Sequence, residues 1–162
     1  MMKKAFPIAL IVLGIVFAAA GLYTVYRGVD AKDQVRGELQ AQNIVTPGDA
    51  RIPNTQVKDI ETARAMSDII HAHAMESTGG LTYAEMDRDD PARDTALNAA
   101  NLRTSLYTSV MAFEVGNLVI GLGLMIVVMG VAVGGLGVAL ASLVIPSLAE
   151  KVHVHPVVED EE

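Results

Sequence analysis

The sequence predicts an all-α membrane protein with two transmembrane helices, outward extensions of both, and a small helical extracytoplasmic domain. Two apolar stretches, residues 5–26 and 106–145, lead to this fold class, because each exceeds the ~20 residues that a helix needs to cross the hydrocarbon core of a bilayer. Residues 27–104 between them hold 9 of the 12 Lys/Arg and 13 of the 19 Asp/Glu. This segregation of charge places a polar domain outside the bilayer, and its acidic balance disfavours nucleic acid as a partner.

Residues 1–26 are the predicted N-terminal signal-anchor helix. Lys3 and Lys4 precede an apolar run of 22 residues, and this run is longer than the about 7–15 apolar residues of a cleavable signal peptide. We therefore expect the segment to remain as an anchor.

The same two lysines favour a cytoplasmic N-terminus, with residues 27–104 on the outer side of the membrane. Arg27, Lys32 and Arg36 flank the first span on the loop side and oppose this assignment. Loops longer than about 60 residues obey the positive-inside rule poorly, however, and the first helix usually dominates. We expect the loop to be extracytoplasmic.

Residues 105–148 form a glycine-rich second transmembrane region that is too long for one simple crossing. Forty residues of helix measure about 60 Å, against about 30 Å of hydrocarbon. Three interpretations stay open: a helix that begins outside, crosses and emerges; a span that ends near residues 134–137 and continues along the interface to Pro146; or two short spans that meet at those glycines. The last is least favoured, since no polar residue would solvate the turn. The crossing itself is predicted at residues 112–134.

The C-terminal residues 149–162 form an acidic tail that we expect to be disordered. His153 and His155 alternate within it in a spacing that suits a metal only if the tail is extended.

The polar domain contains signals for further helices. The first helix is predicted to continue through residues 33–42, and an apolar stripe with helical spacing predicts an amphipathic helix over residues 57–76. A Thr-Gly-Gly run then ends that helix, and Thr82 with Glu85 has the form of a capping box that opens a short helical turn. Asp90-Pro91 predicts the start of a helix that continues into the membrane. The apolar stripe of this last helix comprises Leu102, Leu106, Val110 and Phe113.

The weak candidates for a metal site are His71, His73 and Glu76. Side chains two residues apart on a helix point in directions about 200° apart, whereas chelation of one metal ion from a single helix needs a spacing of three or four residues. Only His73 and Glu76 share a face, so we expect no metal and no cofactor. An acidic cluster lacks the EF-hand glycine and terminal glutamate, and is predicted to cap helices rather than to bind calcium. Its members are Glu85, Asp87, Asp89, Asp90 and Asp94.

Glu114 is an isolated charge in the second apolar stretch, with Asn117 one turn further along. An ionisable group at bilayer depth suggests a proton or ion pathway. Its position near the outer edge favours instead a contact at the interface or between helices, either with Asn117 or with a polar group of a partner.

Small residues spaced by four predict helix packing in the bilayer. Gly130 and Gly134 form a small-xxx-small motif, and Gly14 with Ala18 is its weaker counterpart in the first span. Such surfaces let two helix backbones approach closely, and in lipid this is where association energy is gained. Packing of the two spans within one chain and docking onto another protein both stay open.

Three motifs, residues 46–53 (TPGDARIP), 71–80 and 81–91 (LTYAEMDRDDP), resemble a family of small two-span actinobacterial membrane proteins of uncharacterised function. The resemblance covers about residues 5–133. Some members are labelled as subunits of an aromatic ring-opening dioxygenase, which implies a dioxygenase-related protein as a remote alternative. An extradiol site needs two histidines and a carboxylate on one face of Fe(II), and the candidate histidines here are split by helix geometry.

From these observations we expect a non-enzymatic membrane protein, an accessory or scaffolding subunit of a larger membrane complex or of a homo-oligomer. Its partners would be the lipid bilayer and other membrane subunits or itself. An extracytoplasmic sensor or metal-binding protein is the alternative.

Overall fold

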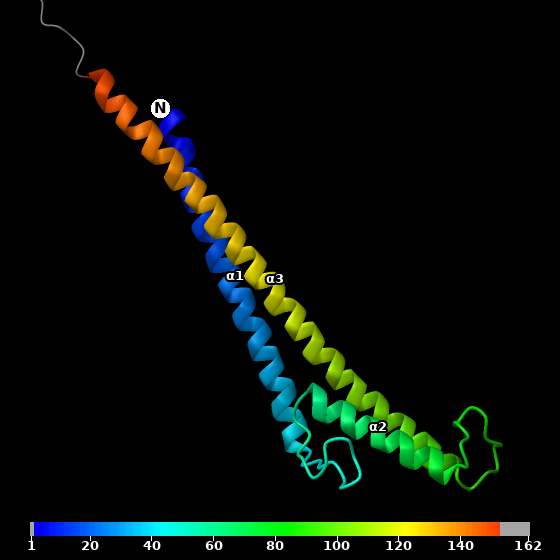
Figure 1. The fold of residues 1–162 in the computed structure, drawn as a ribbon. Coiled ribbons are helices and arrows are strands. Elements are labelled where there is room, and N and C mark those ends of the chain that lie inside the picture. Colours follow the sequence, from blue (N-terminus) through cyan, green and yellow to red (C-terminus); the bar gives the residue numbers. More distant parts are fainter. Residues whose placement is uncertain (1, 153–162) are drawn as a thin grey trace, which may run out of the picture. The chain divides into compact units, whose positions relative to one another are not determined.

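The computed structural model describes residues 2–152, with burial defined for residues 5–143. In this range the chain forms three helices, α1 (Met2–Ala41), α2 (Ile60–Ser77) and α3 (Arg93–Val152), and no β-strand (Figure 1). The predicted all-α fold class is confirmed. Both α1 and α3 are long and apolar enough to cross a membrane, as the two apolar stretches predicted.

The chain divides into two compact units. We call the unit formed by residues 1–26 and 120–162 the helix-pair unit, and the unit formed by residues 27–119 the three-helix unit. On α1 the division falls at the predicted boundary after residue 26. On α3 it falls after Val119, beyond the predicted boundary at residue 104, because the apolar stripe of α3 packs against α1 and α2 up to Phe113.

Helix α3 runs without interruption through residues 134–137. Two short spans that meet at these glycines are therefore the wrong interpretation. A helix that begins well before the apolar stretch, at Arg93, is the arrangement that the structure has. The physical reason is that no turn-forming polar residue interrupts the run, while Gly137 packs on α1 instead of ending the helix. Because α3 continues to Val152, residues 149–152 are helical rather than disordered. The remainder of the predicted tail, with His153 and His155, lies outside the described residues.

The two ends of α2 are closed by backbone and side-chain hydrogen bonds. At its start, Asp59 Oδ1 accepts from the Thr62 amide at 2.9 Å, and the Thr62 hydroxyl accepts from the Asp59 amide at 3.1 Å. This reciprocal capping box shifts the start of the helix from the predicted residue 57 to Ile60. At its end, the Gly80 amide donates to the Met75 carbonyl at 2.7 Å, and Gly79 adopts a φ of 64°. The predicted glycine stop is confirmed.

Helix α3 starts two residues later than Asp90-Pro91 predicted. The Asp90 carboxylate accepts from the Ala92 amide at 2.8 Å, so it caps a turn that precedes the helix. Thr82 and Glu85 likewise close a turn: the Glu85 carboxylate accepts from both the amide and the hydroxyl of Thr82, at 2.8 and 2.7 Å. Half of the predicted capping box is present, because the Glu85 amide donates to the Thr82 carbonyl rather than to its hydroxyl, and no helix follows it.

The three-helix unit has an apolar core to which all three helices contribute. Its centre is Phe113 of α3, which is 2% exposed, and Val57, which is fully buried just before α2. Leu102 was predicted to belong to the same stripe but is 54% exposed, because it lies at the edge of a cavity described below. The buried members of the core are Leu39, Val57, Ala63, Leu106, Val110 and Phe113.

Candidate functional site

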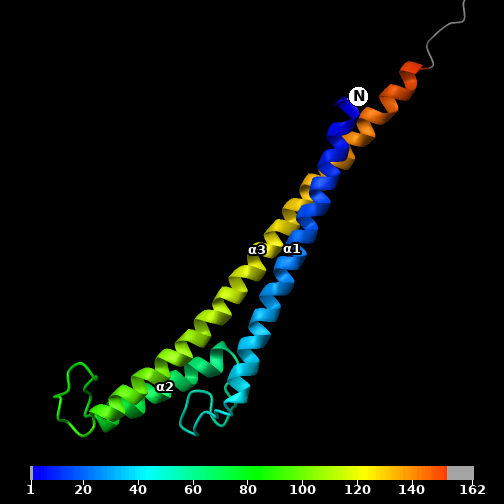
Figure 2. The same cartoon turned by 180° about the vertical axis from the view of Figure 1, so that it is seen from behind.

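Glycines at seven-residue intervals line the contact between α1 and α3 in the helix-pair unit. On α1 the buried positions are Pro7, Gly14 and Gly21, and on α3 they are Gly123, Gly130 and Gly137. Figures 1 and 2 show the two segments side by side and antiparallel in both views. A seven-residue period keeps one face of each helix toward its partner. We call this contact the glycine seam.

The seam brings the two backbones to a distance that leaves no room for a side chain. A Cβ atom added to Gly14 would lie 2.5 Å from the Gly134 nitrogen, and one added to Gly21 would lie 2.7 Å from the Gly123 carbonyl oxygen. A Cβ on Gly130 would lie 2.5 Å from the Ala18 nitrogen. These neighbours are backbone atoms, which cannot rotate away, so glycine is required at these positions.

The four predicted packing residues therefore lie close together within one chain. Gly14 faces Gly130 and Gly134, and Gly130 faces Ala18. Of the two interpretations that the sequence left open, packing within the chain is the one that this arrangement shows. The sequence analysis missed Gly21, Gly123 and Gly137, although a search for a seven-residue repeat would have found them.

Two other glycines of α3 have open surroundings. No heavy atom lies within 4 Å of a Cβ added to Gly121 or to Gly135, and Gly134 would place its Cβ at an ordinary contact distance of 3.7 Å from Gly14 Cα. Helix α3 therefore has one glycine face used within the chain and a second, smaller one that is exposed.

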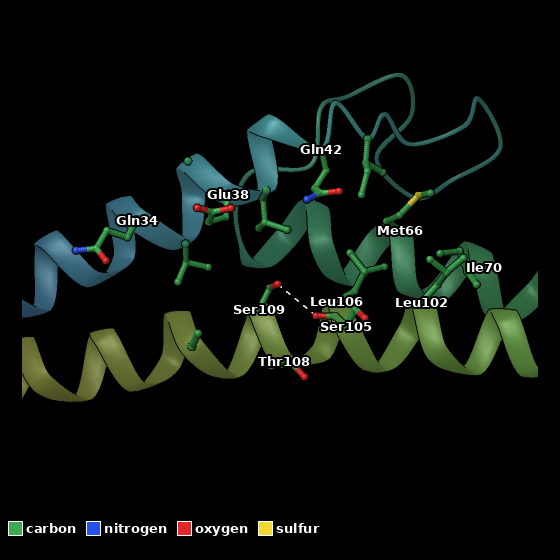
Figure 3. Close-up of a pocket in the computed structure, with 15 residues that line it drawn as sticks. Gln34, Glu38, Gln42, Met66, Ile70, Leu102, Ser105, Leu106, Thr108 and Ser109 are labelled. Carbon is green, nitrogen blue, oxygen red and sulfur yellow. Dashed lines mark hydrogen bonds between the residues drawn. The ribbon is translucent and has the colours of Figure 1, made fainter.

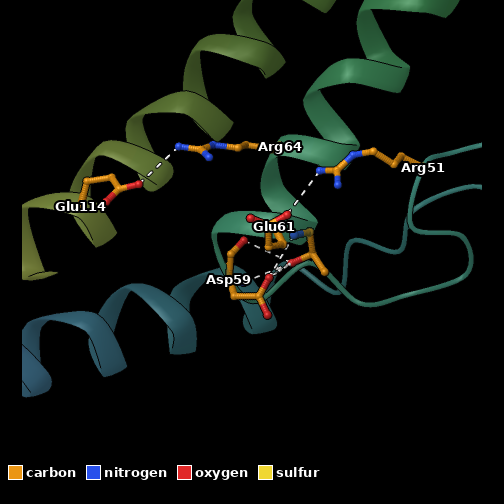
Figure 4. Close-up of polar contacts among 6 residues, drawn as sticks. Arg51, Asp59, Glu61, Arg64 and Glu114 are labelled. Atoms are coloured by element: carbon orange, nitrogen blue, oxygen red, sulfur yellow. Dashed lines mark hydrogen bonds and ion pairs between the residues drawn. The ribbon is translucent and has the colours of Figure 1, made fainter.

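Polar residues in the three-helix unit form a chain that joins all three helices. Glu114 accepts from Arg64 of α2 at 3.3 Å and from Asn117 at 3.3 Å, and Lys32 of α1 donates to Asn117 Oδ1 at 2.7 Å. Figure 4 shows the ion pair between Arg64 and Glu114. The predicted contact of Glu114 with Asn117 is present. Gly116 accommodates the aliphatic part of Lys32, since a Cβ there would lie 2.5 Å from Lys32 Cγ.

The two histidines of α2 have separate partners. His73 Nε2 lies 2.7 Å from Asp49 Oδ2, whereas His71 Nδ1 lies 3.1 Å from Arg103 Nη1. The hydrogen bond from His73 lowers the pKa of the Asp49 carboxyl. Among residues 5–143 no three His, Asp or Glu side chains gather as metal ligands would, and Glu76 forms no hydrogen bond with either histidine.

The acidic residues before α3 also act locally. The hydroxyl of Thr82 donates to Glu85 and, with the Thr82 amide, lowers the pKa of the Glu85 carboxyl. Asp90 caps the turn at Ala92, as described above. These contacts agree with the predicted capping role for these two members of the cluster.

A cavity of about 900 Å³ lies within the three-helix unit, between α1 and α3 with α2 at one side (Figure 3). Its size is that of pockets that hold drug-sized ligands, about 300–1,000 Å³. Its polar side chains come mainly from α1 and α3. The apolar residues that line it are Val35, Leu39, Ile44, Met66, Ile70, Leu102, Leu106 and Ala112. The sequence analysis did not find this cavity, because its lining comes from three separate segments.

The glycine seam, the polar chain and the cavity are thus the candidate sites of this protein. Comparison with known proteins adds no other, since no protein-family model, no curated protein and no solved structure matches the chain.

Proposed function

We propose that this protein is a non-enzymatic integral membrane protein that serves as an accessory subunit of a larger membrane complex or of a homo-oligomer. The observation that carries the proposal is the exposed glycine face of α3, where a Cβ added to Gly121 or Gly135 meets no atom within 4 Å. The glycine seam joins the two spans through backbone contacts within the chain, so they act as one anchor for the three-helix unit. Small residues at a helix surface are where association energy is gained in lipid, and those of the seam are used internally. Contacts with another subunit would then involve the exposed faces.

The dimensions of α1 support a membrane location for the helix-pair unit. Residues 5–26 of helix measure about 33 Å, which matches a hydrocarbon core of about 30 Å. Tyr23 and Tyr26 at the end of this segment are both 63% exposed, as expected for aromatic side chains at the headgroup level. We propose the plasma membrane of a bacterial cell, because residues 46–91 resemble actinobacterial membrane proteins, and we propose the three-helix unit outside on the basis of Lys3 and Lys4.

The second glycine face of α3 is the docking surface that we propose for another subunit. Gly121 and Gly135 are separated by four helical turns and lie on the same side as Val128, which is 68% exposed. A helix that packs here would approach α3 closely without disturbing the seam.

The test is the native mass of the protein, extracted from its own membrane into lipid nanodiscs. We expect a particle heavier than one 17.1 kDa chain. The double variant Gly121→Leu with Gly135→Leu should reduce it to a single chain, because leucine blocks the open face while its Cβ meets no atom within 4 Å at either position. Ala9→Leu with Ala19→Leu, at exposed positions of α1, is the matched control and should leave the mass unchanged.

Two results would count against this function. A wild-type particle with the mass of one chain rules out both the complex and the homo-oligomer. A heavier particle that survives the α3 double variant rules out the second glycine face as the docking surface. Substitution of Gly130 would not answer the question, because it disrupts the seam itself.

The cavity in the three-helix unit favours a second candidate, a ligand-binding or sensor protein. An apolar cavity with a few polar groups at its edge is the usual form of a small-molecule site. This candidate is compatible with an accessory role, since the same chain can bind a ligand outside the membrane and a subunit within it.

A further inference from the structure

The cavity between α1 and α3 combines an apolar floor with an edge that is rich in hydrogen-bond acceptors. Glu38 is the charged side chain among its 15 lining residues, and no lysine, arginine or histidine is among them. In the described part of the chain Glu38 forms no ion pair, since each of the four ion pairs there joins other residues. The carboxylate of Glu38 is therefore available to a ligand.

The serine hydroxyl groups of α3 at this edge already donate hydrogen bonds to backbone carbonyls of the same helix. Ser105 Oγ donates to the Asn101 carbonyl at 3.1 Å. Ser109 Oγ donates to the Ser105 carbonyl at 3.2 Å, which Figure 3 marks with a dashed line. A hydroxyl has one proton and two lone pairs, so both oxygens keep acceptor capacity only. Gln34 differs in that its Nε2 donates one of its two protons to Asp30 at 2.9 Å and keeps the other, while its carbonyl oxygen stays an acceptor.

The carboxylate of Glu38 and the serine oxygens favour a ligand that brings donors and positive charge, and the floor favours a ligand with apolar surface. We propose that the cavity binds an amphipathic cation, a molecule with an alkyl or aryl body and an ammonium or guanidinium head. The apolar body would lie against Met66, Ile70 and Leu106, and the head would lie at Glu38 and Ser109. This inference rests on the ligand-binding function proposed above and names the ligand class.

The charge at the cavity itself supports the same class. Glu38 is the charged lining residue, and the neighbouring acids Asp30 and Asp33 of α1 are balanced by Lys32 and by Arg36, which pairs with Asp33 at 2.7 Å. A carboxylate attracts cations and repels anions over about 10 Å at moderate ionic strength. A carboxylate ligand of the same size would meet repulsion at Glu38 and no compensating donor from Ser105 or Ser109.

The experiment is a titration of the full chain in nanodiscs with n-octylammonium, octanoate and 1-octanol, followed through methyl signals of ¹³C-methyl-labelled methionine. Met66 lines the cavity and reports binding there. Met125 is 63% exposed on the helix-pair unit and reports simple partition into lipid. We expect saturable shifts of Met66 with n-octylammonium, at concentrations about tenfold below any response to octanoate.

The variant Glu38→Gln should weaken the binding of n-octylammonium up to about fivefold, the range of a solvent-exposed ion pair. Glu76→Gln, an exposed acid at the end of α2 outside the lining, is the control and should leave it unchanged. Equal affinity for all three probes, with no effect of Glu38→Gln, would overturn the cation preference and leave a general apolar site. A Met66 signal that responds to none of them would overturn both the inference and the ligand-binding function, as would a bound second chain that fills the cavity.

Discussion

The seam predicts a sharp difference between glycines that look alike in the sequence. We consider Gly14→Ala, which adds one methyl group to α1. Its carbon would lie 2.5 Å from the Gly134 nitrogen and 2.6 Å from the Gly130 carbonyl oxygen, whereas ordinary contacts begin at 3.4 Å. Since both neighbours are backbone atoms, the helices must separate by roughly 0.9 Å, the difference between 3.4 and 2.5 Å.

A separation of this size affects the whole contact rather than one pair of atoms. A radial gap of 0.5–1 Å loses roughly a quarter to a half of each dispersion contact, and overpacking of a tight interior usually costs about 1–3 kcal/mol. We expect Gly14→Ala to lower the free energy of unfolding of the helix pair by about 1–3 kcal/mol. Gly134→Ala and Gly135→Ala are the controls, since the first adds a contact at 3.7 Å and the second meets nothing within 4 Å.

The chain has no cysteine, so two can be introduced for dyes without background labelling. We would place them at Ala5→Cys on α1 and Val138→Cys on α3, two exposed positions near the same end of the seam. Energy transfer between the two dyes is then followed while dodecyl sulfate unfolds the protein in mixed micelles. The reasoning is refuted if all three alanine variants unfold within about 0.5 kcal/mol of the parent protein, or if Gly135→Ala is the most destabilised.

Two further predictions concern the three-helix unit. Phe113→Ala should cost about 3–5 kcal/mol of unfolding free energy, while Met111→Ala, at a 67% exposed position, should cost less than about 0.5 kcal/mol, and hydrogen exchange of α2 amides measures both. Partial burial raises the pKa of Asp59, but hydrogen bonds from the amide and hydroxyl of Thr62 outweigh this effect and leave the pKa below 3.8. The stabilisation by ionised Asp59 is therefore complete above that value and is lost as the pH falls through the lowered pKa. Thermal melts of the parent and of Asp59→Asn, taken between about pH 6 and about pH 3, should therefore converge toward low pH, and a constant difference would contradict this sign.

The helices could be predicted because their signals are local. Apolar runs of sufficient length predicted α1 and α3, and the stripe through Val57 and Ala63 predicted α2, whose end at two glycines is as expected. The start of α2 was placed three residues early, because the pairing of Asp59 with Thr62 uses threonine rather than the usual glutamate at the third helical position. The packing of α3 in the three-helix unit could not be predicted, because Leu106, Val110 and Phe113 resemble membrane residues in the sequence, whereas α1 and α2 cover them in the structure.

The partners of Glu114 could be identified in full only from the tertiary structure. The sequence pointed to Asn117 one turn away, but Arg64 is 50 residues distant along the chain. The cavity could likewise be found only from the tertiary structure, because its lining residues Glu38, Met66 and Ser109 come from three helices.

The sequence alone determined that this protein has two helices able to cross a membrane and a polar helical unit between them, because hydrophobic length and capping residues act within one segment. It also contains the seven-residue spacing of glycines on both long helices. Only the tertiary structure decided what that spacing is for. Glycine permits close approach without specifying a partner, and the antiparallel return of α3 along α1 places one set of glycines against the other within the chain.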